Sequence, residues 1–154
     1  MPAQEQAVTI RRASSADVPA LGVVARQAYL HYVPRIGRKP APMTADYSAA
    51  VRSGQAWVAE ADGEVAGLLV LVVCQGYLLI ENVAVLPSAQ RRGIGARLLV
   101  LAEDEARAHG LGEIRLYTNE AMTENLAYYP SHGYVETHRA EEDGFRRVFF
   151  SKRL

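Results

Sequence analysis

The stretch QRRGIGA (residues 90–96) places two arginines and two glycines where an apolar helical pattern begins. Glycine at a helix start costs roughly 0.5–1 kcal/mol relative to alanine, so Gly93 and Gly95 should serve an approach that a Cβ atom would block. A helix N-terminus carries unpaired N–H groups and a partial positive charge, and it therefore binds anions. The guanidinium groups of Arg91 and Arg92 also suit phosphate. Together these residues predict a phosphate cradle.

Two common phosphate-binding motifs do not fit this stretch. The dinucleotide fingerprint G-x-G-x-x-G needs a third glycine at the position of Leu98. The P-loop needs Gly-Lys-Ser/Thr at its end, and the sequence has no such triplet here. A G-x-G pair also occurs at tight turns and close packing contacts, so a purely structural role and a scaffold for another nucleotide both stay open.

Glu81 is a second candidate for chemistry, because it interrupts the apolar stretch YLLIENVAVL. Strand alternation would put Leu79, Glu81 and Val83 on one face. An acid on an interior strand is uncommon unless it has a role. Glu81 could take a proton, directly or through water, or bind a cationic acceptor. It could also serve as a structural hydrogen-bond acceptor.

Length and composition limit the class of protein. The chain of 154 residues fits one domain, 1–154, with room for a substantial core. Its 17 Lys and Arg balance 17 Asp and Glu, so the net charge indicates neither nucleic acid nor an anionic membrane as partner. Cys74 is the only cysteine, which excludes an internal disulfide and a cysteine-rich metal site. Without a signal core or a bilayer-length apolar run, we expect a soluble cytoplasmic protein.

Hydrophobic periodicity and turn residues predict one mixed α/β domain in the order β-α-α-β-β-β-α-β-α-β-β. Thr44 should cap the second helix. The final stretch FRRVFFSKRL alternates like an exposed edge strand, through which a homodimer could form. We expect strands over 8–13, 55–61, 64–73, 77–86, 113–119 and in a hairpin within 133–154, helices over 17–33, 44–53, 95–109 and 123–131, and a loop over 34–43.

Two motifs together resemble the GNAT family of N-acetyltransferases. The stretch ENVAVLPSAQRRGIGARLL (residues 81–99) is similar to the family signature Q/R-x-x-G-x-G/A, which follows a strand and a V-x-P turn. The stretch NLAYYPSHGYVE (residues 125–136) is similar to the second signature, in which Tyr129 stands four residues before Gly133-Tyr134. The predicted element order matches the family's fold over nearly the whole chain. The resemblance implies a central mixed sheet flanked by helices.

The resemblance also implies acetyl-CoA as co-substrate. The exposed backbone of the splayed strand before the loop, at Val83, Ala84 and Val85, would pair with the pantetheine arm. One departure concerns the asparagine that family members often carry seven residues before the tyrosine, because Met122 stands there and Asn125 takes a position commonly held by Ala. Asn119 and Asn125 are both candidates for contact with the arm. The pyrophosphate would lie on the backbone amides from Arg91 to Ala96. The implied CoA-binding residues of this loop are Gln90, Arg91, Arg92, Gly93, Ile94, Gly95 and Ala96.

Amide formation from a thioester needs a neutral amine and a proton for the departing sulfur. Tyr129 stands at the family's usual position for that proton donor, although it could also be a packing tyrosine. Glu81 is a candidate for taking the amine proton. The histidines could also be bases, although each could instead have a structural role: His31, His109, His132 and His138. Cys74 lies away from both signatures, so no acyl-cysteine intermediate is expected. None of the four histidines has the partner spacing of a metal site, so we expect no metal.

The acceptor site, by the same resemblance, would be edged by YLHYVPRIGRKPAPM (residues 29–43). Tyr29, Tyr32, Arg35 and, further on, Tyr47 are the candidate acceptor-binding residues. With Arg38 and Lys39 they would form an aromatic pocket with a positive rim, which favours an acceptor that carries a carboxylate. The alternative is a solvated basic loop.

We therefore predict an N-acetyltransferase that transfers acetyl directly from acetyl-CoA to a primary amine in a ternary complex. The alternative is a CoA-binding regulatory or interaction module without turnover. The acceptor stays open between a small amine, an amino acid, an antibiotic, and a protein N-terminus or lysine.

Overall fold

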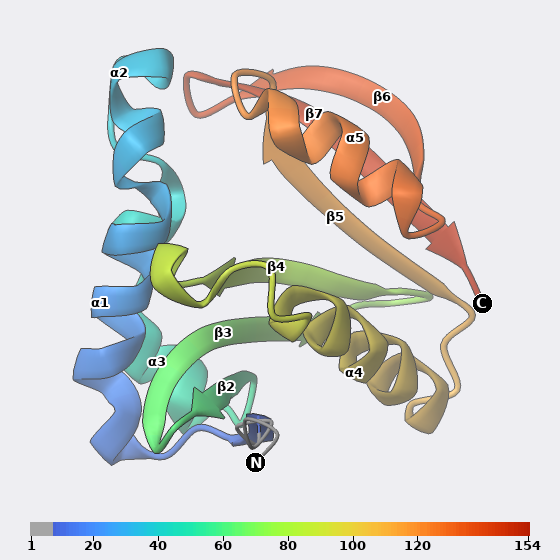
Figure 1. Cartoon of the computed structure of the whole chain (residues 1–154). Coiled ribbons are helices and arrows are strands. Elements are labelled where there is room, and N and C mark those ends of the chain that lie inside the picture. The colour runs from blue at the N-terminus through green and yellow to red at the C-terminus, as the bar shows by residue number, and fades with distance from the viewer. Residues whose placement is uncertain (1–7) are drawn as a thin grey trace, which may run out of the picture.

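The computed structural model describes residues 8–154, so residues 1–7 of the predicted domain lie outside the described residues. Within this range one sheet has the strand order β1-β2-β3-β4-β5-β7-β6. Strands β4 and β5 run parallel, and the other neighbouring pairs run antiparallel (Figure 1). The predicted α/β fold with a mixed sheet is therefore confirmed. The strands are β1 (Val8–Arg12), β2 (Ala56–Ala61), β3 (Glu64–Val73), β4 (Leu78–Val85), β5 (Glu113–Asn119), β6 (Val135–Glu142) and β7 (Phe145–Arg153).

Helices cover both faces of the sheet, because alternate residues of β3 pack into two different cores. Leu68 and Val70 lie in a core with residues of α1, whereas Leu69 and Leu71 lie in a core with residues of α4. The helical segments are α1 (Val18–Tyr29), α2 (Val33–Ile36), α3 (Tyr47–Arg52), α4 (Ile94–Ala108) and α5 (Thr123–Ser131), with 3-10 turns η1 (Ser15–Asp17), η2 (Leu30–Tyr32), η3 (Ala41–Met43) and η4 (Pro87–Ala89).

Strands β4 and β5 pair over only a short stretch. The parallel register runs from Leu78↔Ile114 to Ile80↔Leu116 and then stops. Figure 1 shows the two strands meeting at one end and diverging toward α1. The sheet therefore opens into a V, and the backbone of β4 beyond Ile80 is free on its β5 side.

A β-bulge lies where β4 leaves β5. Leu71 on β3 pairs with Ile80, and Val70 pairs with Asn82, so Glu81 is the extra residue. The bulge shifts the alternation, and Ile80 and Val83 pack in the same core. The expectation that Leu79, Glu81 and Val83 share one face is therefore wrong, because Val83 joins the face of Ile80.

Several predicted boundaries agree with the structure and a few do not. The helix over 123–131 has the predicted bounds, and α4 begins within the glycine loop. The predicted cap at Thr44 is wrong, because Asp46 accepts the N–H of Ala49 at 3.0 Å and α3 begins after it. The first predicted helix ends at Tyr29 and continues as η2 and α2, and the predicted loop 34–43 contains part of α2 and all of η3.

At the C-terminal end of the sheet order, the edge strand is β6 and not β7. β7 pairs with β5 on one side and with β6 on the other, so the expectation of an edge strand at FRRVFFSKRL is wrong. Its alternation reflects one face in the core, which carries Val148 and Phe150, and an opposite face that is less buried. A homodimer that pairs through a strand edge at this end would have to use β6, and it stays a prediction.

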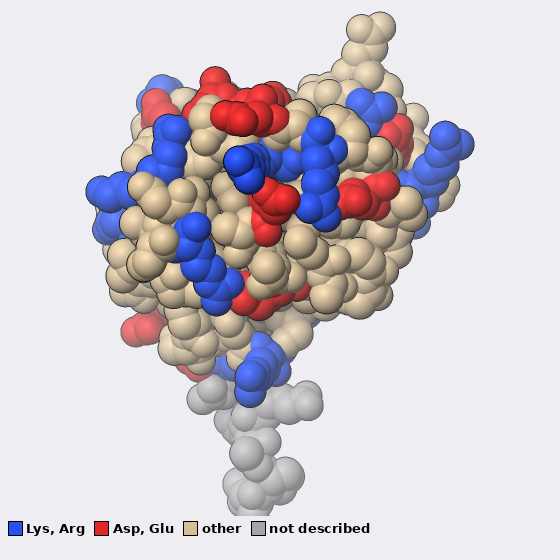
Figure 2. All heavy atoms as spheres, turned by 90° about the horizontal axis from the view of Figure 1, so that it is seen from above, with Lys and Arg blue, Asp and Glu red and all other residues tan. Residues whose placement is uncertain are grey.

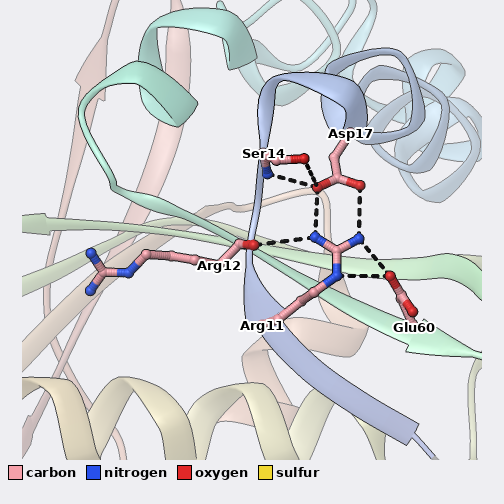
Figure 3. A network of polar contacts seen from close by, with 5 residues as sticks. All are labelled: Arg11, Arg12, Ser14, Asp17 and Glu60. Carbon is pink, nitrogen blue, oxygen red and sulfur yellow. Dashed lines mark hydrogen bonds and ion pairs between the residues drawn. The ribbon is translucent and has the colours of Figure 1, made fainter.

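A polar network fixes the start of α1 to the outer strands (Figure 3). Arg11 on β1 donates to both carboxylate oxygens of Asp17, at 2.7 and 2.9 Å, and its Nε donates to Glu60 on β2 at 2.8 Å. The backbone N–H of Ser14 also donates to Asp17, at 2.7 Å. These hydrogen bonds, Arg11 first, lower the pKa of Asp17 well below its ordinary value. Asp17 therefore stays ionised at neutral pH and anchors the turn before α1.

Candidate functional site

A groove of about 690 Å³ occupies the open V beside the start of α4. Its walls come from α1 and η2, from β4, from the loop and first turn of α4, and from α5. The groove brings together most of the residues that the sequence assigns to a CoA site. These are Val83, Ala84, Val85, Gln90, Arg91, Gly93, Ile94, Gly95, Ala96, Asn125 and Tyr129.

Two predicted CoA-site residues lie elsewhere. The guanidinium of Arg92 reaches Asp62 at 3.4 Å and does not line the groove. Asn119 lines a second, smaller pocket and accepts the N–H of Ala121 at 2.9 Å. Of the two asparagines considered, Asn125 is therefore the one in the groove.

The first turn of α4 presents free N–H groups to the groove. The helix begins at Ile94, and the N–H of Arg97 meets the carbonyl of Gly93 at 3.1 Å. In an α-helix the amides before this one have no partner within the helix, which here concerns Ile94, Gly95 and Ala96. Among residues 8–154, no side chain caps this end. The arrangement suits an anion such as a phosphate.

Gly93 and Gly95 are needed for different reasons. Gly93 has φ +78°, in the left-handed region that favours glycine, and a Cβ atom there would meet nothing within 4 Å. At Gly95 a Cβ atom would lie 2.9 Å from the hydroxyl oxygen of Tyr128 on α5. Gly93 therefore allows the turn into the helix, and Gly95 allows the Tyr128 hydroxyl to lie close to the helix backbone.

The free edge of β4 carries two carbonyls that face the groove. The Tyr29 hydroxyl donates to the carbonyl of Val83 at 3.0 Å, and the side-chain amide of Gln90 donates to that of Val85 at 3.2 Å. The N–H of Leu86 donates to the carbonyl of Ala66 on the β3 side. The carbonyl of Val85 belongs to the same peptide group and therefore points away from β3, toward the groove. A polar chain can therefore meet main-chain groups along this edge.

A second pocket, of about 110 Å³, lies against the same V and shares Tyr29, Val83, Asn125 and Tyr129 with the groove. Glu81 lines it, so both predicted proton-transfer residues border this pocket. The sequence interpretation missed several other lining residues. These are Asn82, Tyr117, Thr118, Phe145 and Arg147.

Tyr129 stands at the junction of the two cavities, within an aromatic cluster. Its ring centroid lies 5.8 Å from those of Tyr134 and Phe150, and 5.4 Å from that of Tyr128. Burial raises the pKa of Tyr129 well above its ordinary value. The hydroxyl therefore stays protonated at neutral pH, as a proton donor must.

The structure does not place the predicted acceptor-binding residues in one pocket. Tyr29 borders both cavities, and Tyr32 lines the groove while its hydroxyl donates to Glu124 at 2.9 Å. Burial and this hydrogen bond raise the pKa of Tyr32 to about 12. Arg35 pairs with the same Glu124 at 2.7 Å and lines neither cavity.

The positive rim expected at the segment 29–43 is also not at the smaller pocket. Arg38 donates to the carbonyl of Asp143 at 3.0 Å, and its guanidinium lies 4.0 Å from the ring centroid of Phe145. Figure 2, which looks onto the end that is uppermost in Figure 1, shows basic and acidic side chains interspersed on the surface. The basic group that does line the pocket is Arg147, from the other side of the V.

Tyr47 belongs to a hydrogen-bonded network behind the pocket. The side-chain amide of Asn82 donates to the Tyr47 hydroxyl at 2.7 Å, and this hydroxyl donates to the carbonyl of Pro42 at 2.6 Å. The Tyr29 hydroxyl lies 3.2 Å from the Asn82 side-chain oxygen. The network ties η3 and α1 to the bulge of β4. An asparagine within an apolar strand was the signal in the sequence that could have found it.

The chain belongs to the acetyltransferase (GNAT) family. The sequence profile of that family matches residues 25–134, a stretch that includes the glycine loop and Tyr129 to Tyr134 of the second signature. No curated protein sequence shows significant similarity to the chain.

Solved structures show the same fold. The PaiA N-acetyltransferase from Thermoplasma acidophilum, in complex with coenzyme A, is 20% identical, with a TM-score of 0.81 over 96% of this chain and 99% of that chain. The ribosomal-protein-S18-alanine N-acetyltransferase from Escherichia coli is 20% identical, with a TM-score of 0.76 over 96% of this chain and 94% of that chain. YncA from Salmonella typhimurium, solved with its cofactor acetyl-CoA, is 22% identical, with a TM-score of 0.75 over 96% and 94%.

Two further observations concern metals and membranes. Within residues 8–154, no three His, Cys, Asp or Glu side chains gather closely enough to hold a metal ion. In the same range, no helix has the length and apolar character needed to cross a membrane.

Proposed function

We propose that this protein is an acetyl-CoA-dependent N-acetyltransferase that transfers acetyl directly to a primary amine in a ternary complex. One observation carries the proposal: a groove with a phosphate-binding helix end and a small pocket with an acid meet at Tyr129, where β4 and β5 diverge. Two substrates can therefore approach from different sides and react at one point.

The groove offers groups that fit CoA along its length. The amides of Ile94, Gly95 and Ala96, with Arg91 beside them, would hold the pyrophosphate. The backbone of Val83 to Val85, which pairs with no strand on its β5 side, would pair with the amides of the pantetheine arm, and Asn125 would add a side-chain contact. Membership of the acetyltransferase family and neighbours solved with CoA or acetyl-CoA support this assignment.

Bound acetyl-CoA supplies an acetyl thioester, whose C–S bond breaks as the C–N bond to the amine forms. Tyr129 gives its hydroxyl proton to the departing sulfur, which leaves as a free thiol. Glu81 takes the proton released by the amine, directly or through water, and proton exchange with solvent restores Tyr129. The raised pKa of Tyr129 keeps its hydroxyl protonated at neutral pH, and its position where the two cavities meet supports its role as the proton donor.

The test combines binding with turnover. Acetyl-CoA at a hundredfold excess over its dissociation constant should stabilise the protein by about 2.7 kcal/mol, seen as a rise in melting temperature. Thiol release from acetyl-CoA, followed with a thiol reagent, should rise when one amine from a panel is added, and mass spectrometry should find the acetylated amine. Binding of acetyl-CoA with thiol release that no amine changes would instead indicate a CoA-binding module without transfer.

A further inference from the structure

Arg147 is an unusual arginine in this protein. Its side chain is 11% exposed, whereas the other ion-paired arginines within residues 8–154 are 33–57% exposed. Its nearest carboxylate oxygens, on Glu142 and Asp143, are 3.9 Å away, beyond hydrogen-bond range. In the described part of the chain its guanidinium donates no hydrogen bond, although a guanidinium has five N–H donors.

Aromatic rings hold this guanidinium in place at the smaller pocket. Its central carbon lies 4.4 Å from the ring centroid of Tyr117 on β5 and 5.7 Å from that of Phe145 on its own strand. All three residues line the smaller pocket. Stacking on aromatic rings favours a guanidinium without using its N–H donors, so these remain available for a ligand.

Glu81 on β4 also lines this pocket. The pocket therefore presents an acid from one wall of the V and a guanidinium from the other. A molecule that carries both an ammonium group and a carboxylate matches this pair of charges. A polycationic amine matches only Glu81 and would bring a second positive charge toward a guanidinium that is only 11% exposed, which is unfavourable.

The volume limits how far apart the two groups of the ligand can be. The pocket holds about 110 Å³, and a cavity of roughly 150 Å³ accommodates benzene. The amine must also reach Tyr129 at the junction with the groove. The carboxylate must therefore be only a few bonds from the amine.

We propose that Arg147 forms a carboxylate subsite, so that the acetyl acceptor is a free amino acid or a close analogue with a short spacing between amine and carboxylate. This inference rests on the proposed N-acetyltransferase function and deepens it by naming the substrate class. Arg147 takes the role that the sequence assigned to Arg35 and its neighbours. Its planar fork donates two parallel hydrogen bonds to the carboxylate.

The experiment compares amino acids with their uncharged counterparts. Glycine, alanine, serine and glutamate are each tested beside the corresponding α-carboxamide, with amine-dependent thiol release as the assay. At least one amino acid should exceed its carboxamide in kcat/KM by about 10²-fold, as expected for a charge-assisted bidentate contact. In Arg147→Gln this preference should fall to within about threefold, while the KM for acetyl-CoA stays unchanged.

The matched control is Arg146→Gln, which changes the neighbouring exposed arginine of β7 and should keep the preference. Arg147→Lys should restore only part of it, because an ammonium lacks the planar fork. A second readout does not depend on turnover: calorimetry should detect N-acetylamino acids binding to the CoA complex of the parent and not to that of Arg147→Gln. If Arg147→Gln does not fold, the comparison of acids with carboxamides in the parent decides the inference.

The outcomes separate this inference from the proposed function. Acetylation of carboxamides or of spermidine as efficient as that of amino acids would overturn the carboxylate subsite and leave the acetyltransferase function intact. Binding of N-acetylamino acids without acetylation of any amine would contradict the proposed function and support the subsite. If the protein neither binds N-acetylamino acids nor acetylates amino acids in preference to their carboxamides, the carboxylate subsite is excluded.

Discussion

Glu81 and Tyr129 border one pocket but lie in different surroundings. Glu81 is exposed at a bulge, where it can exchange protons with water, whereas Tyr129 is buried among aromatic rings. A base benefits from contact with solvent because it must release the proton that it takes. Burial raises the pKa of the Tyr129 phenol, so its hydroxyl is protonated throughout the neutral range. The two environments therefore fit a base that exchanges protons with solvent and a hydroxyl that is protonated before transfer.

The first residue-level prediction concerns Tyr129→Phe, which removes one oxygen and keeps the ring packing with Tyr134 and Phe150. If Tyr129 protonates the departing sulfur, kcat should fall about 10²-fold while the dissociation constant of CoA changes little. Steady-state kinetics and calorimetry measure the two quantities. Because burial raises the pKa of Tyr129, the parent should show no rate loss from its ionisation below about pH 10, the ordinary pKa of tyrosine.

Tyr134→Phe is the matched control for that variant. Tyr134 lies in the same cluster, borders neither cavity, and its buried hydroxyl has no hydrogen-bond partner within residues 8–154. Removing an unsatisfied buried hydroxyl should leave kcat unchanged and should not lower stability. A normal kcat in Tyr129→Phe, or an equal loss in both variants, would reduce Tyr129 to a packing residue.

The N-terminal end of α4 is the helix end that the proposed function depends on most, because it lines the CoA groove. Its start contacts α5 through Gly95 and Tyr128, and both residues line the groove. A methyl group at residue 95 would have to displace the Tyr128 hydroxyl and would narrow the groove beside the free amides. This element therefore couples the packing of α5 to the width of the proposed CoA site.

We predict that Gly95→Ala weakens CoA binding at least about tenfold, or 1.4 kcal/mol, and lowers the melting temperature. Adding Tyr128→Phe removes the oxygen at 2.9 Å and leaves the next ring atom at an ordinary 3.9 Å, so the double variant should regain stability. CoA affinity should stay reduced in it, since the methyl group still lies in the groove. Calorimetry and thermal unfolding measure both effects.

Gly112→Ala is the control for that series, because a Cβ atom there meets nothing within 4 Å and its φ is not in the left-handed region. It should bind CoA like the parent. Full recovery of CoA affinity in the double variant would show that Gly95 serves only the packing of Tyr128.

For the protein as a whole, the two ends of the sheet have different roles. The V between β4 and β5 leaves backbone groups of the sheet free for ligands, whereas β1 and β2 are fastened to α1 by the Arg11–Asp17–Glu60 network. A cleft inside a sheet removes backbone hydrogen bonds between two strands. Contacts elsewhere in the protein therefore contribute a larger share of its folding stability. The network therefore makes the overall stability depend on the charge of Asp17.

We predict that Asp17→Asn lowers the free energy of unfolding at pH 7 by about 1–3 kcal/mol, the range for a hydrogen bond with a charged group. The pKa of Asp17 is lower in the folded chain than the unfolded value of about 3.9, so the carboxylate stabilises the fold at neutral pH. Its contribution is lost as the pH falls below about 4. Urea unfolding should therefore show a deficit in Asp17→Asn that shrinks from pH 7 to pH 2.5.

Glu64→Gln changes an exposed carboxylate of β3 and should match the parent at both pH values. A deficit in Asp17→Asn of equal size at pH 7 and pH 2.5 would mean that the aspartate acts through packing and not through its charge.

Features set by neighbouring residues could be predicted from the sequence. The glycine loop before α4, the bounds of α5 and the Asp-Gly hairpin turns depend on local backbone preferences, which need no knowledge of the rest of the fold. The family signatures are of the same kind, because QRRGIGA and the Tyr129 motif are contiguous stretches. The family that they predicted is confirmed, and most of the residues that they assigned to CoA line the groove, whereas Arg92 and Asn119 do not.

Features that depend on strand register could not be predicted in this way. The bulge at Glu81 arises from the pairing of β4 with β3, and it moved Val83 to the other face. Arg147 stands opposite Asn119 only because β7 inserts between β5 and β6, and the bare alternation of FRRVFFSKRL looks the same in an edge strand. Arg35 was assigned to the acceptor by its position in a basic loop, yet Glu124, far away in the sequence, pairs with it. Contacts between distant segments determine which charged side chains are available, and such contacts form only when the chain folds.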